Sequence, residues 1–459
     1  MARQFDAIIV GTGQAGPPLA GRLTDAGWRC AIIERQRFGG TCVNYGCTPT
    51  KTLVASARAA YMVRRAADFG VEIEGTVSVD VAKIKRRKDE IAGRSNESIT
   101  SYVKDMKNAV VFEGHAVFEG DQRLRVAGET IEAEKIFINV GARAAIPPIE
   151  GMDEVPYLTN SSLLGLESLP EHLIILGGGY VGVEFAQMYR RFGSQVTILD
   201  HAPRLMGSED EDVSQEIRAI FEAEGIEIVT GAKVERVTRD SHGLRATIGV
   251  GGKRREIAGS HFLVAAGRKP NTDDLGLENT GIETDEKGYV RVDDRLQTAV
   301  DGVFALGDCN GRGAFTHTSY NDYEILAGNL LEGDDREVSD RFITYAAFID
   351  PPFARVGASE SELRAAGRRT LVARLPMTGV ARARERSETD GFMKTLVDPN
   401  TGRFLGASML GSRCDEVVHA IIYLMYARAT YQDVMRAVPI HPCVAELIPT
   451  MLKQLQPLE

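Results

Sequence analysis

The sequence predicts an α/β protein with two Rossmann-like dinucleotide-binding domains, because one strand–turn–helix–strand pattern occurs twice along the chain. In the first copy, an apolar strand over residues 5–10 leads into a glycine-rich turn and a helix, and a second strand over 30–34 ends in an acid. The second copy repeats this order between residues 173 and 200. Apolar strands that alternate with helices are typical of a parallel sheet with both faces covered.

The first glycine-rich turn has the spacing that binding of a dinucleotide requires. Gly11, Gly13 and Gly16 occupy its first, third and sixth positions. The first glycine permits the tight turn, the second lets the backbone approach a pyrophosphate, and the third lets the helix pack closely on the strand. The helix N-terminus then faces the phosphates. Glu34 ends the following strand, where it can accept hydrogen bonds from a ribose.

The second turn repeats the motif with Gly177, Gly179 and Gly182, and Asp200 follows its first glycine at the same interval as Glu34 in the first copy. Two motifs in register, each with a strand, a helix and an acid, are a far stronger signal than one. A carboxylate at this place binds a free 2′-hydroxyl and repels a 2′-phosphate. The motif therefore favours NADH over NADPH, although the neighbouring cations His201 and Arg204 could partly offset the repulsion.

Two cysteines, Cys42 and Cys47, follow the first unit in the segment 39–51. Five positions on a regular helix span about 7.5 Å, whereas a relaxed disulfide has its Cα atoms no more than about 7 Å apart. We therefore expect the chain to bend between them, with Gly46 supplying the freedom. The alternative is a pair of buried structural thiols. Their place beside a dinucleotide unit favours a redox-active disulfide and a relay from nicotinamide through flavin to sulfur.

Composition excludes several other classes of protein. The chain has 459 residues, 43% of them hydrophobic, which suffices for about three domains with cores. A net charge of −10 argues against nonspecific nucleic-acid binding. With no stretch of about 18 apolar residues and no signal peptide at the start, we expect no membrane association. Six scattered cysteines without a CxxC pair predict no metal site and suit the cytoplasm.

These motifs resemble those of the pyridine nucleotide–disulfide oxidoreductases, the family of glutathione reductase, dihydrolipoamide dehydrogenase and mercuric reductase. The first glycine turn is similar to the family's FAD site, and the second, followed by Glu184, to its NAD(P)H site. Residues 266–272 resemble the strand that closes the nicotinamide domain. Residues 303–308 resemble the second FAD motif, and 351–357 resemble the start of the dimerisation domain. The resemblance runs nearly end to end and implies FAD together with NADH or NADPH as cofactors.

The resemblance also implies roles for single residues. Cys42 would be the interchange thiol that attacks substrate, and Cys47 the charge-transfer thiol against the flavin. Lys51 and Glu184 would form an ion pair near the flavin N5 edge. Further cofactor contacts implied by the resemblance are Gly40, Thr41, Lys51, Gly141, Gly307 and Asp308 for FAD and Gly267 for NAD(P)H.

A histidine near the C-terminus completes the implied site. His441, tuned by Glu446 five positions later, would be the acid/base that serves the interchange thiol. A carboxylate on the other ring nitrogen would fix the tautomer and raise the basicity of the imidazole. In the family this histidine comes from the other subunit. The resemblance therefore implies a homodimer whose active sites are shared between subunits.

The motifs and the resemblance together predict four segments. Residues 1–150 and 270–337 form the two parts of the FAD domain, 151–269 form the NAD(P)H domain, and 338–459 form an α+β dimerisation domain. Inside these segments we expect an antiparallel hairpin set at 110–135. Further expectations are a solvated basic helix face within 58–110, strands at 392–397 and 404–410, and a helix at 414–429 whose apolar residues suit a partner subunit.

Some features depart from the family pattern. The run 315–323 is unusually polar; it either marks a subfamily or contributes only its backbone to the flavin site. Cys443 is a third thiol near the active site or, the favoured interpretation, a small apolar filler. The tail 451–459 lacks the C-terminal cysteine pair of mercuric reductases, so efficient mercury reduction is not expected. The remaining cysteines, Cys30, Cys309 and Cys414, are interpreted as packing.

The sequence thus predicts an NAD(P)H-dependent flavoprotein oxidoreductase that passes electrons through Cys42 and Cys47 to a small disulfide or a soft metal ion. One alternative is dihydrolipoamide dehydrogenase, which runs the relay in reverse. An alternative of another class is a flavin-containing redox sensor whose disulfide switches conformation. A pure sensor would not need the acid/base pair of His441 and Glu446, which favours an enzyme.

Overall fold

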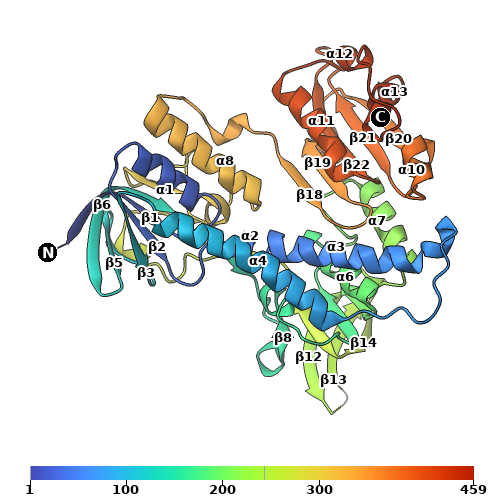
Figure 1. Cartoon of the computed structure of the whole chain (residues 1–459), viewed down its shortest axis with the longest axis horizontal. Helices are drawn as coiled ribbons and strands as arrows, with labels where there is room; N and C mark the ends of the chain where they lie inside the picture. Colours follow the sequence, from blue (N-terminus) through green and yellow to red (C-terminus); the bar gives the residue numbers. More distant parts are fainter. Residues whose placement is uncertain (1, 242, 459) are drawn as a thin grey trace.

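The computed structural model describes residues 2–241 and 243–458. Figure 1 shows a first sheet with its helices beside the N-terminus, a second dinucleotide unit below, and a C-terminal domain above. Two long helices, α3 (Cys47–Arg64) and α4 (Val81–Lys104), run between these parts. The predicted fold class, two Rossmann-type units followed by an α+β domain, is confirmed.

The first sheet has seven strands, and β1 (Arg3–Val10) lies parallel between β2 (Cys30–Glu34) and β6 (Glu129–Ile138). Successive residues of β1, Ile8 and Ile9, enter different cores on the two faces and are fully buried. Both faces are therefore covered, as the apolar strands predicted. The other members are β3 (Ala109–Glu113), β4 (Val117–Gly120), β5 (Arg123–Val126) and β17 (Val303–Ala305).

The prediction of an antiparallel hairpin set at 110–135 was only partly right. Strands β4, β5 and β6 pair antiparallel, but β3 pairs parallel with β2, and β6 pairs parallel with β1 on its other edge. Short alternating strands carry no mark of their pairing direction. On one face of the sheet, α1 (Gly16–Asp25) and α8 (Thr316–Ala327) pack side by side.

The second unit contains a five-stranded parallel sheet built around β9 (His172–Leu176). The helix α6 (Tyr180–Phe192) leaves its glycine turn, and α7 (Glu211–Ala223) follows β10. Strand β15 is the last strand of this sheet in chain order, and it ends before the run 266–272 that was expected to form the closing strand. Part of that run instead forms β16, which pairs with β7. The remaining strands of the unit are β8 (Tyr157–Leu158), β10 (Gln195–Leu199), β11 (Glu227–Val229), β12 (Lys233–Asp240), β13 (Gly243–Val250), β14 (Lys253–Gly259), β15 (His261–Val264), β16 (Arg268–Pro270) and, from the first unit, β7 (Ala142–Ala144).

The C-terminal domain has an antiparallel six-stranded sheet covered by α11 (Cys414–Tyr426). Both expected strands occur, as β21 (Phe392–Val397) and β22 (Phe404–Leu410). The expected role of the helix was wrong for Val417 and Ile421, which pack into the core of their own domain instead of facing outward. The outer face carries the exposed Tyr423 and Tyr426. The other strands are β18 (Thr344–Ala347), β19 (Phe353–Gly357), β20 (Leu371–Pro376) and β23 (Gln456–Pro457).

The basic run at 83–88 lies in α4 and was expected to face solvent. Only some of its basic side chains do so. Lys83 and Arg86 are exposed, whereas Lys88 is buried and its Nζ donates to the Leu164 carbonyl oxygen at 2.8 Å. A long lysine stem can lie along apolar surface while its ammonium group finds a partner. Among the described residues, no helix combines the length and the apolar character that a membrane span needs.

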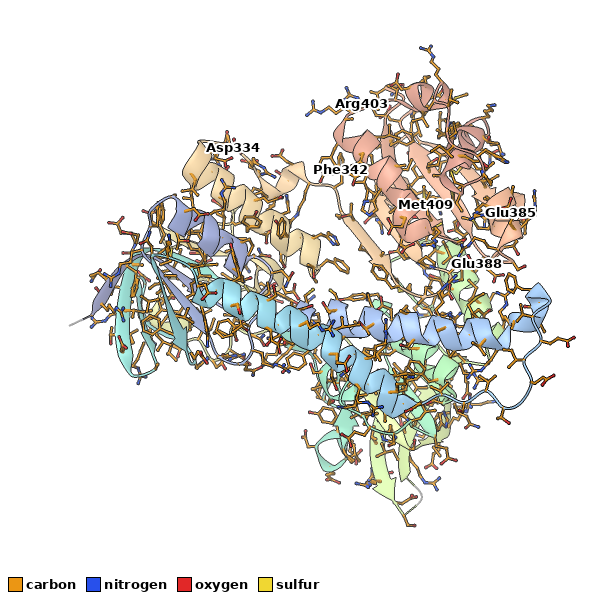
Figure 2. All side chains as sticks on the ribbon, viewed as in Figure 1. Asp334, Phe342, Glu385, Glu388, Arg403 and Met409 are labelled. Atoms are coloured by element: carbon orange, nitrogen blue, oxygen red, sulfur yellow. The ribbon has the colours of Figure 1, made fainter. Side chains whose placement is uncertain are left out.

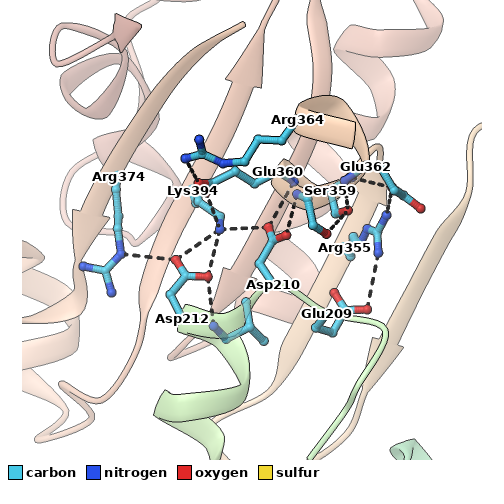
Figure 3. Close-up of polar contacts among 12 residues, drawn as sticks. Glu209, Asp210, Asp212, Arg355, Ser359, Glu360, Glu362, Arg364, Arg374 and Lys394 are labelled. Carbon is cyan, nitrogen blue, oxygen red and sulfur yellow. Dashed lines mark hydrogen bonds and ion pairs between the residues drawn. The ribbon is translucent and has the colours of Figure 1, made fainter. Parts of the chain in front are cut away.

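A buried ionic cluster joins the second unit to the C-terminal domain (Figure 3). Lys394 of β21 is 1% exposed, and its Nζ lies 2.9 Å from Asp210 and from Asp212 and 3.1 Å from Glu360. Asp210 also accepts the backbone N–H groups of Glu360 and Ser361, at the start of α9 (Glu360–Ala365). One ammonium group thus links α7, α9 and β21.

A second contact joins the same domain to α3. Figure 2 shows Glu388 at the edge of the C-terminal domain that faces this helix. Glu388 accepts hydrogen bonds from Arg58 of α3, from Arg386 and from the Ser412 hydroxyl. Although burial opposes its ionisation, these donors hold its pKa at about 2. The helix that carries the second cysteine is therefore braced against the C-terminal domain.

Candidate active site

A single large cleft of about 1140 Å³ gathers most of the residues proposed from the sequence. It extends from the first glycine turn past the two cysteines to α6, α8 and α11. The predicted residues that line it are Gly11, Gly13, Glu34, Gly40, Thr41, Cys42, Cys47, Lys51, Gly141, Glu184 and Asp308. Of the described residues, the second glycine motif, Asp200, His441 and Glu446 lie outside this lining.

The two cysteines lie at the junction of two helices. Helix α2 (Gly40–Asn44) ends before Tyr45, and α3 starts at Cys47, so the chain bends between the thiols as predicted. At Gly46, a Cβ atom would stand 3.0 Å from the Thr41 carbonyl oxygen and 3.3 Å from the Cys42 Cα. The bend is therefore tight enough to require glycine there, which brings the start of α3 against α2.

The thiols form a polarised pair. A hydrogen bond from Cys42 lowers the pKa of Cys47 to about 6, despite burial, with smaller contributions from Thr316 and the Lys51 ammonium. The same contact and burial raise the pKa of Cys42 well above its ordinary value. The two shifts run in opposite directions, so Cys47 is the sulfur that ionises first and Cys42 is the one that keeps its proton. A thiolate at the N-terminus of a helix is also favoured by the helix dipole.

Lys51 lies one turn after Cys47 on α3 and forms the predicted contact with Glu184. Its Nζ is 2.6 Å and 2.8 Å from the two carboxylate oxygens of Glu184. Glu184, on α6, is 4% exposed and also accepts the Phe348 backbone N–H at 2.8 Å. This pair places a fixed positive charge beside the thiols and ties α3 to α6.

The first glycine turn is shaped for a dinucleotide. Thr12 donates its backbone N–H to Glu34 at 3.1 Å, and its hydroxyl contacts the same carboxylate oxygen. Gly40 packs so closely on Gly13 that a Cβ would stand 2.8 Å from the Gly13 Cα. The turn therefore presents bare backbone to the cleft, and an acid stands at the end of β2, as binding of FAD requires.

The far end of the cleft carries Asp308. It lies 3.2 Å from Arg268, and its side chain is 18% exposed. Burial raises its pKa, and the Arg268 guanidinium opposes the shift. Gly307 adopts φ +67° and donates its N–H to Asp322 at 2.8 Å, and Gly141 adopts φ +66° at the cleft wall. Gly267 lies outside the cleft lining, beside Arg268.

The second glycine motif lies outside the cleft lining, although Tyr180 and Val181, the first residues of the helix that follows it, line the cleft. Gly177 adopts φ +113°, and Gly182 packs directly on the Gly177 carbonyl, as this motif requires. Asp200 accepts the backbone N–H of Gly178 at 2.7 Å and of Ala202 at 2.9 Å. This acid is therefore anchored at the turn, and Gly179 faces open space.

His441 and Glu446 meet as predicted but stand away from the thiols of their own chain. The His441 Nδ1 lies 3.0 Å from both carboxylate oxygens of Glu446. Glu446 is 10% exposed, whereas His441 is 74% exposed. A carboxylate on Nδ1 favours the tautomer with an unprotonated Nε2, and that Nε2 is available to a group outside this chain.

Sequence reasoning missed Thr316. The run 315–323 was interpreted either as the mark of a subfamily or as a segment that contributes only its backbone to the flavin site. The Thr316 hydroxyl of this run, however, lies 3.2 Å from the Cys47 sulfur. Phe315 stacks between His317 and Tyr345, with ring centroids 5.5 Å and 5.4 Å apart. The only sequence signal was the position of this hydroxyl at the start of a helix after the second FAD motif.

The other cysteines divide into two groups. Cys30, Cys309 and Cys414 are fully buried, which confirms packing, and burial raises the pKa of both Cys30 and Cys309 to about 12. Cys443 is half-buried, and its sulfur lies 3.1 Å from the Ile440 carbonyl oxygen. Its own subunit therefore does not enclose it as a filler would require.

A cleft with a dinucleotide turn, a thiol pair and a lysine–glutamate pair defines a flavoprotein oxidoreductase. Comparison with known proteins agrees: the family description "Pyridine nucleotide-disulphide oxidoreductase" matches residues 5–322, and the dimerisation domain of that family matches 343–452. The chain belongs to this family and is an FAD- and NAD(P)H-dependent enzyme.

Individual relatives are similar over nearly the whole chain. "Probable pyridine nucleotide-disulfide oxidoreductase RclA" of Escherichia coli (strain K12) is 37% identical over 96% of this chain and 97% of its own. A mercuric reductase of Streptomyces lividans is 33% identical over 94% of this chain and 92% of its own. The structure titled "Cu(II) complex of HOCl-induced flavoprotein disulfide reductase RclA from Escherichia coli" has a TM-score of 0.89 at 36% identity, covering 99% of both chains.

Proposed function

We propose that this enzyme takes electrons from NADH and delivers them through Cys42 and Cys47 to a small disulfide or to a soft metal ion such as Cu(II). The observation that carries the proposal is the polarised thiol pair in the cleft of the first dinucleotide turn. FAD bound in that cleft would supply the hydride acceptor between nicotinamide and disulfide. The Cu(II) complex of the RclA relative supports the metal-ion arm.

The thiol chemistry balances with the groups present. The Cys42 sulfur gives up its proton and attacks one sulfur of the substrate disulfide, which releases one thiol and leaves a mixed disulfide. The Cys47 thiolate then attacks Cys42, so the Cys42–Cys47 bond forms and the second substrate sulfur leaves. The unprotonated Nε2 of His441 would take the Cys42 proton and return it to the first departing sulfur, and the second departing sulfur takes its proton from solvent. With a metal substrate, two Cu(II) ions would each take one electron from the same dithiol.

Purified holoenzyme should be assayed with NADH and NADPH against lipoamide, glutathione disulfide, Hg(II) and Cu(II). We expect NADH-dependent reduction of at least one disulfide or of Cu(II). NADH oxidation that never exceeds the rate with oxygen alone would contradict the proposal. A reducing cytoplasm is the compartment we propose, because it would keep the thiol pair cycling.

The preference for NADH should depend on Asp200. Its carboxylate is 7% exposed and fixed by two backbone N–H groups, so it meets a 2′-phosphate with a fixed negative charge. Arg204 donates to the Glu209 carbonyl oxygen at 3.2 Å, so this hydrogen bond does not go to the Asp200 carboxylate. We expect kcat/KM to favour NADH, and Asp200→Asn to lower the NADH/NADPH ratio by about tenfold, which corresponds to about 1.4 kcal/mol.

Steady-state kinetics with both coenzymes test this prediction. His201→Asn is the matched control, because His201 is 92% exposed beside the same carboxylate. We expect this control to shift the ratio by less than about twofold, as exposed charges contribute little. An unchanged ratio in Asp200→Asn would refute the assignment.

We also propose a homodimer in which each cleft receives His441 from the partner subunit. His441 is exposed and absent from the cleft lining of the described residues, while Val438 and Ile440 beside it are 96% and 82% exposed. Apolar side chains this exposed in one chain indicate a surface that a second chain covers. The matched dimerisation domain supports this arrangement.

Mixed dimers test the shared site. Cys42→Ser and His441→Ala homodimers should both lose disulfide reduction. A dimer with one subunit of each kind contains one complete site, made of Cys42 from one chain and His441 from the other. We therefore expect about half of the parent activity per mixed dimer. Separate affinity tags would isolate that species, and its inactivity would show that the two residues act in the same chain.

A further inference from the structure

Thr316 is the first residue of α8, and the structure holds it firmly against the thiol pair. Its hydroxyl lies 3.2 Å from the Cys47 sulfur. The helix start is fixed by Thr318, whose hydroxyl accepts the Phe315 N–H at 3.1 Å and contacts the Phe315 carbonyl oxygen. The Phe315 ring is stacked between His317 and Tyr345, and both interplanar angles are 7°. The hydroxyl therefore has a fixed position.

The Thr316 hydroxyl has no competing partner. In the part of the chain that the structure describes, its hydrogen-bonding contacts are with the sulfurs of Cys47 and Cys42 only. The Lys51 ammonium, in contrast, is already bound to both carboxylate oxygens of Glu184. Among the described residues, Thr316 thus supplies the side-chain hydroxyl that lies within hydrogen-bond distance of the Cys47 sulfur.

The charged and titratable groups around Cys47 come from three helices. Cys42 contributes from α2, Lys51 from α3, and Tyr180 and Glu184 from α6, while α8 contributes no charge at this point, only the Thr316 hydroxyl. A hydroxyl can donate to a thiolate or accept from a thiol. Beside a sulfur that loses its proton readily, it is a donor.

We propose that Thr316 donates a hydrogen bond to the Cys47 sulfur and keeps it ionised after Cys42 has been joined to substrate. The inference rests on the proposed relay and adds a residue to it. In the free dithiol, Cys42 itself donates to Cys47. Once the Cys42 sulfur is part of a mixed disulfide, that proton is gone, and Thr316 is the remaining side-chain donor within hydrogen-bond distance.

This stage is where a thiolate is needed. The Cys47 thiolate must attack the Cys42 sulfur to release the second half of the substrate, and a protonated Cys47 would stall there. Lys51 helps by its charge, but its ammonium is already shared with Glu184. A hydrogen bond to a charged acceptor is worth enough to move an ionisation by about one pH unit.

The test measures the ionisation of Cys47 directly. In a Cys42→Ser holoprotein, the rate at which iodoacetamide alkylates Cys47 is followed against pH, with the modified peptide quantified by mass spectrometry. Adding Thr316→Val should raise the midpoint of this profile by about one pH unit, and Thr316→Ser should restore it. Thr52→Val is the control: it removes a hydroxyl from the helix that carries Cys47, where it donates to the Thr48 carbonyl oxygen at 2.8 Å, so its midpoint should stay at the parent value.

A second readout uses the otherwise unaltered enzyme. The pH midpoint of the long-wavelength thiolate–flavin absorbance should rise in Thr316→Val and not in Thr316→Ser. An unchanged midpoint in Thr316→Val, or an equal shift in Thr52→Val, would overturn the inference. The alkylation profile does not need turnover, so an enzyme that reduces no disulfide or metal ion but still shows the Thr316 shift would refute the proposed function alone.

Discussion

Cys42→Ser is expected to abolish disulfide reduction, by at least about a thousandfold, because it removes the nucleophile. It should leave NADH-dependent reduction of a one-electron dye largely intact. The cleft shows why the activities separate: the dinucleotide turn, Glu34 and the Lys51–Glu184 pair do not depend on the Cys42 sulfur for their contacts. Dye reduction needs only these, whereas disulfide reduction needs a thiol that can leave the pair and bind substrate.

The measurement is a side-by-side rate with a disulfide and with a dye, on protein of equal FAD content. Cys30→Ala is the control, since it also removes one thiol, from a buried core outside the cleft lining, and its disulfide activity should match the parent. Cys47→Ser should fail with disulfides too, because the mixed disulfide cannot be resolved. Equal loss of dye and disulfide activity in Cys42→Ser would mean that the thiols do not lie downstream of the flavin.

The parts of the site that could be predicted are those whose geometry is determined by residues close together in the sequence. Gly11, Gly177 and their neighbours are fixed by turn geometry, and the bend at Gly46 follows from helix rise and disulfide reach. His441 and Glu446 were paired through the family resemblance and their separation of five positions, and their 3.0 Å contact agrees. Each of these depends on a few neighbouring residues, which a sequence displays directly.

The features that the sequence did not reveal depend on partners far along the chain. Thr316 reaches Cys47 across a separation of 269 residues, and nothing in its own neighbourhood marks that meeting. Lys88 looked like part of a solvated face because its acceptor, the Leu164 carbonyl, belongs to another unit. The apolar residues of α11 could have faced a partner or their own sheet, since periodicity gives a face and not its neighbour.

The same limit applies to Lys394, whose three carboxylate partners come from positions 210, 212 and 360. Lys394→Met should destabilise the protein by about 3–5 kcal/mol, the usual cost of removing one partner from a buried ionic cluster. The methionine fills the same space, so the loss comes from carboxylates left together without their cation, as the geometry in Figure 3 shows. We expect the thermal midpoint of the FAD-loaded protein to fall by about 5–10 °C.

The pH dependence of this loss distinguishes electrostatics from packing. Burial opposes ionisation of Asp210, but hydrogen bonds from Lys394 and from the Ser361 N–H outweigh it and hold its pKa below the ordinary value. The ionised Asp210 carboxylate contributes to the free energy of unfolding above about pH 4. This contribution disappears as the pH falls through the lowered pKa of the folded state. The Lys394 pKa is raised: burial lowers it, but Asp212 and Asp210 more than compensate. The contribution of the Lys394 ammonium group to the free energy of unfolding is complete below about pH 10 and is lost above it.

The difference in thermal midpoint between the parent and Lys394→Met should therefore be constant from about pH 5 to pH 9 and shrink below about pH 4. Lys85→Met is the control, because Lys85 contacts Asp89 at 2.9 Å on the exposed side of α4. A pair of that kind is worth about 0.3–0.5 kcal/mol, so this variant should melt within about 1 °C of the parent. If Lys394→Met lost the same stability at pH 3 as at pH 7, packing and not charge would hold this joint, and the link between the second unit and the C-terminal domain would not be ionic.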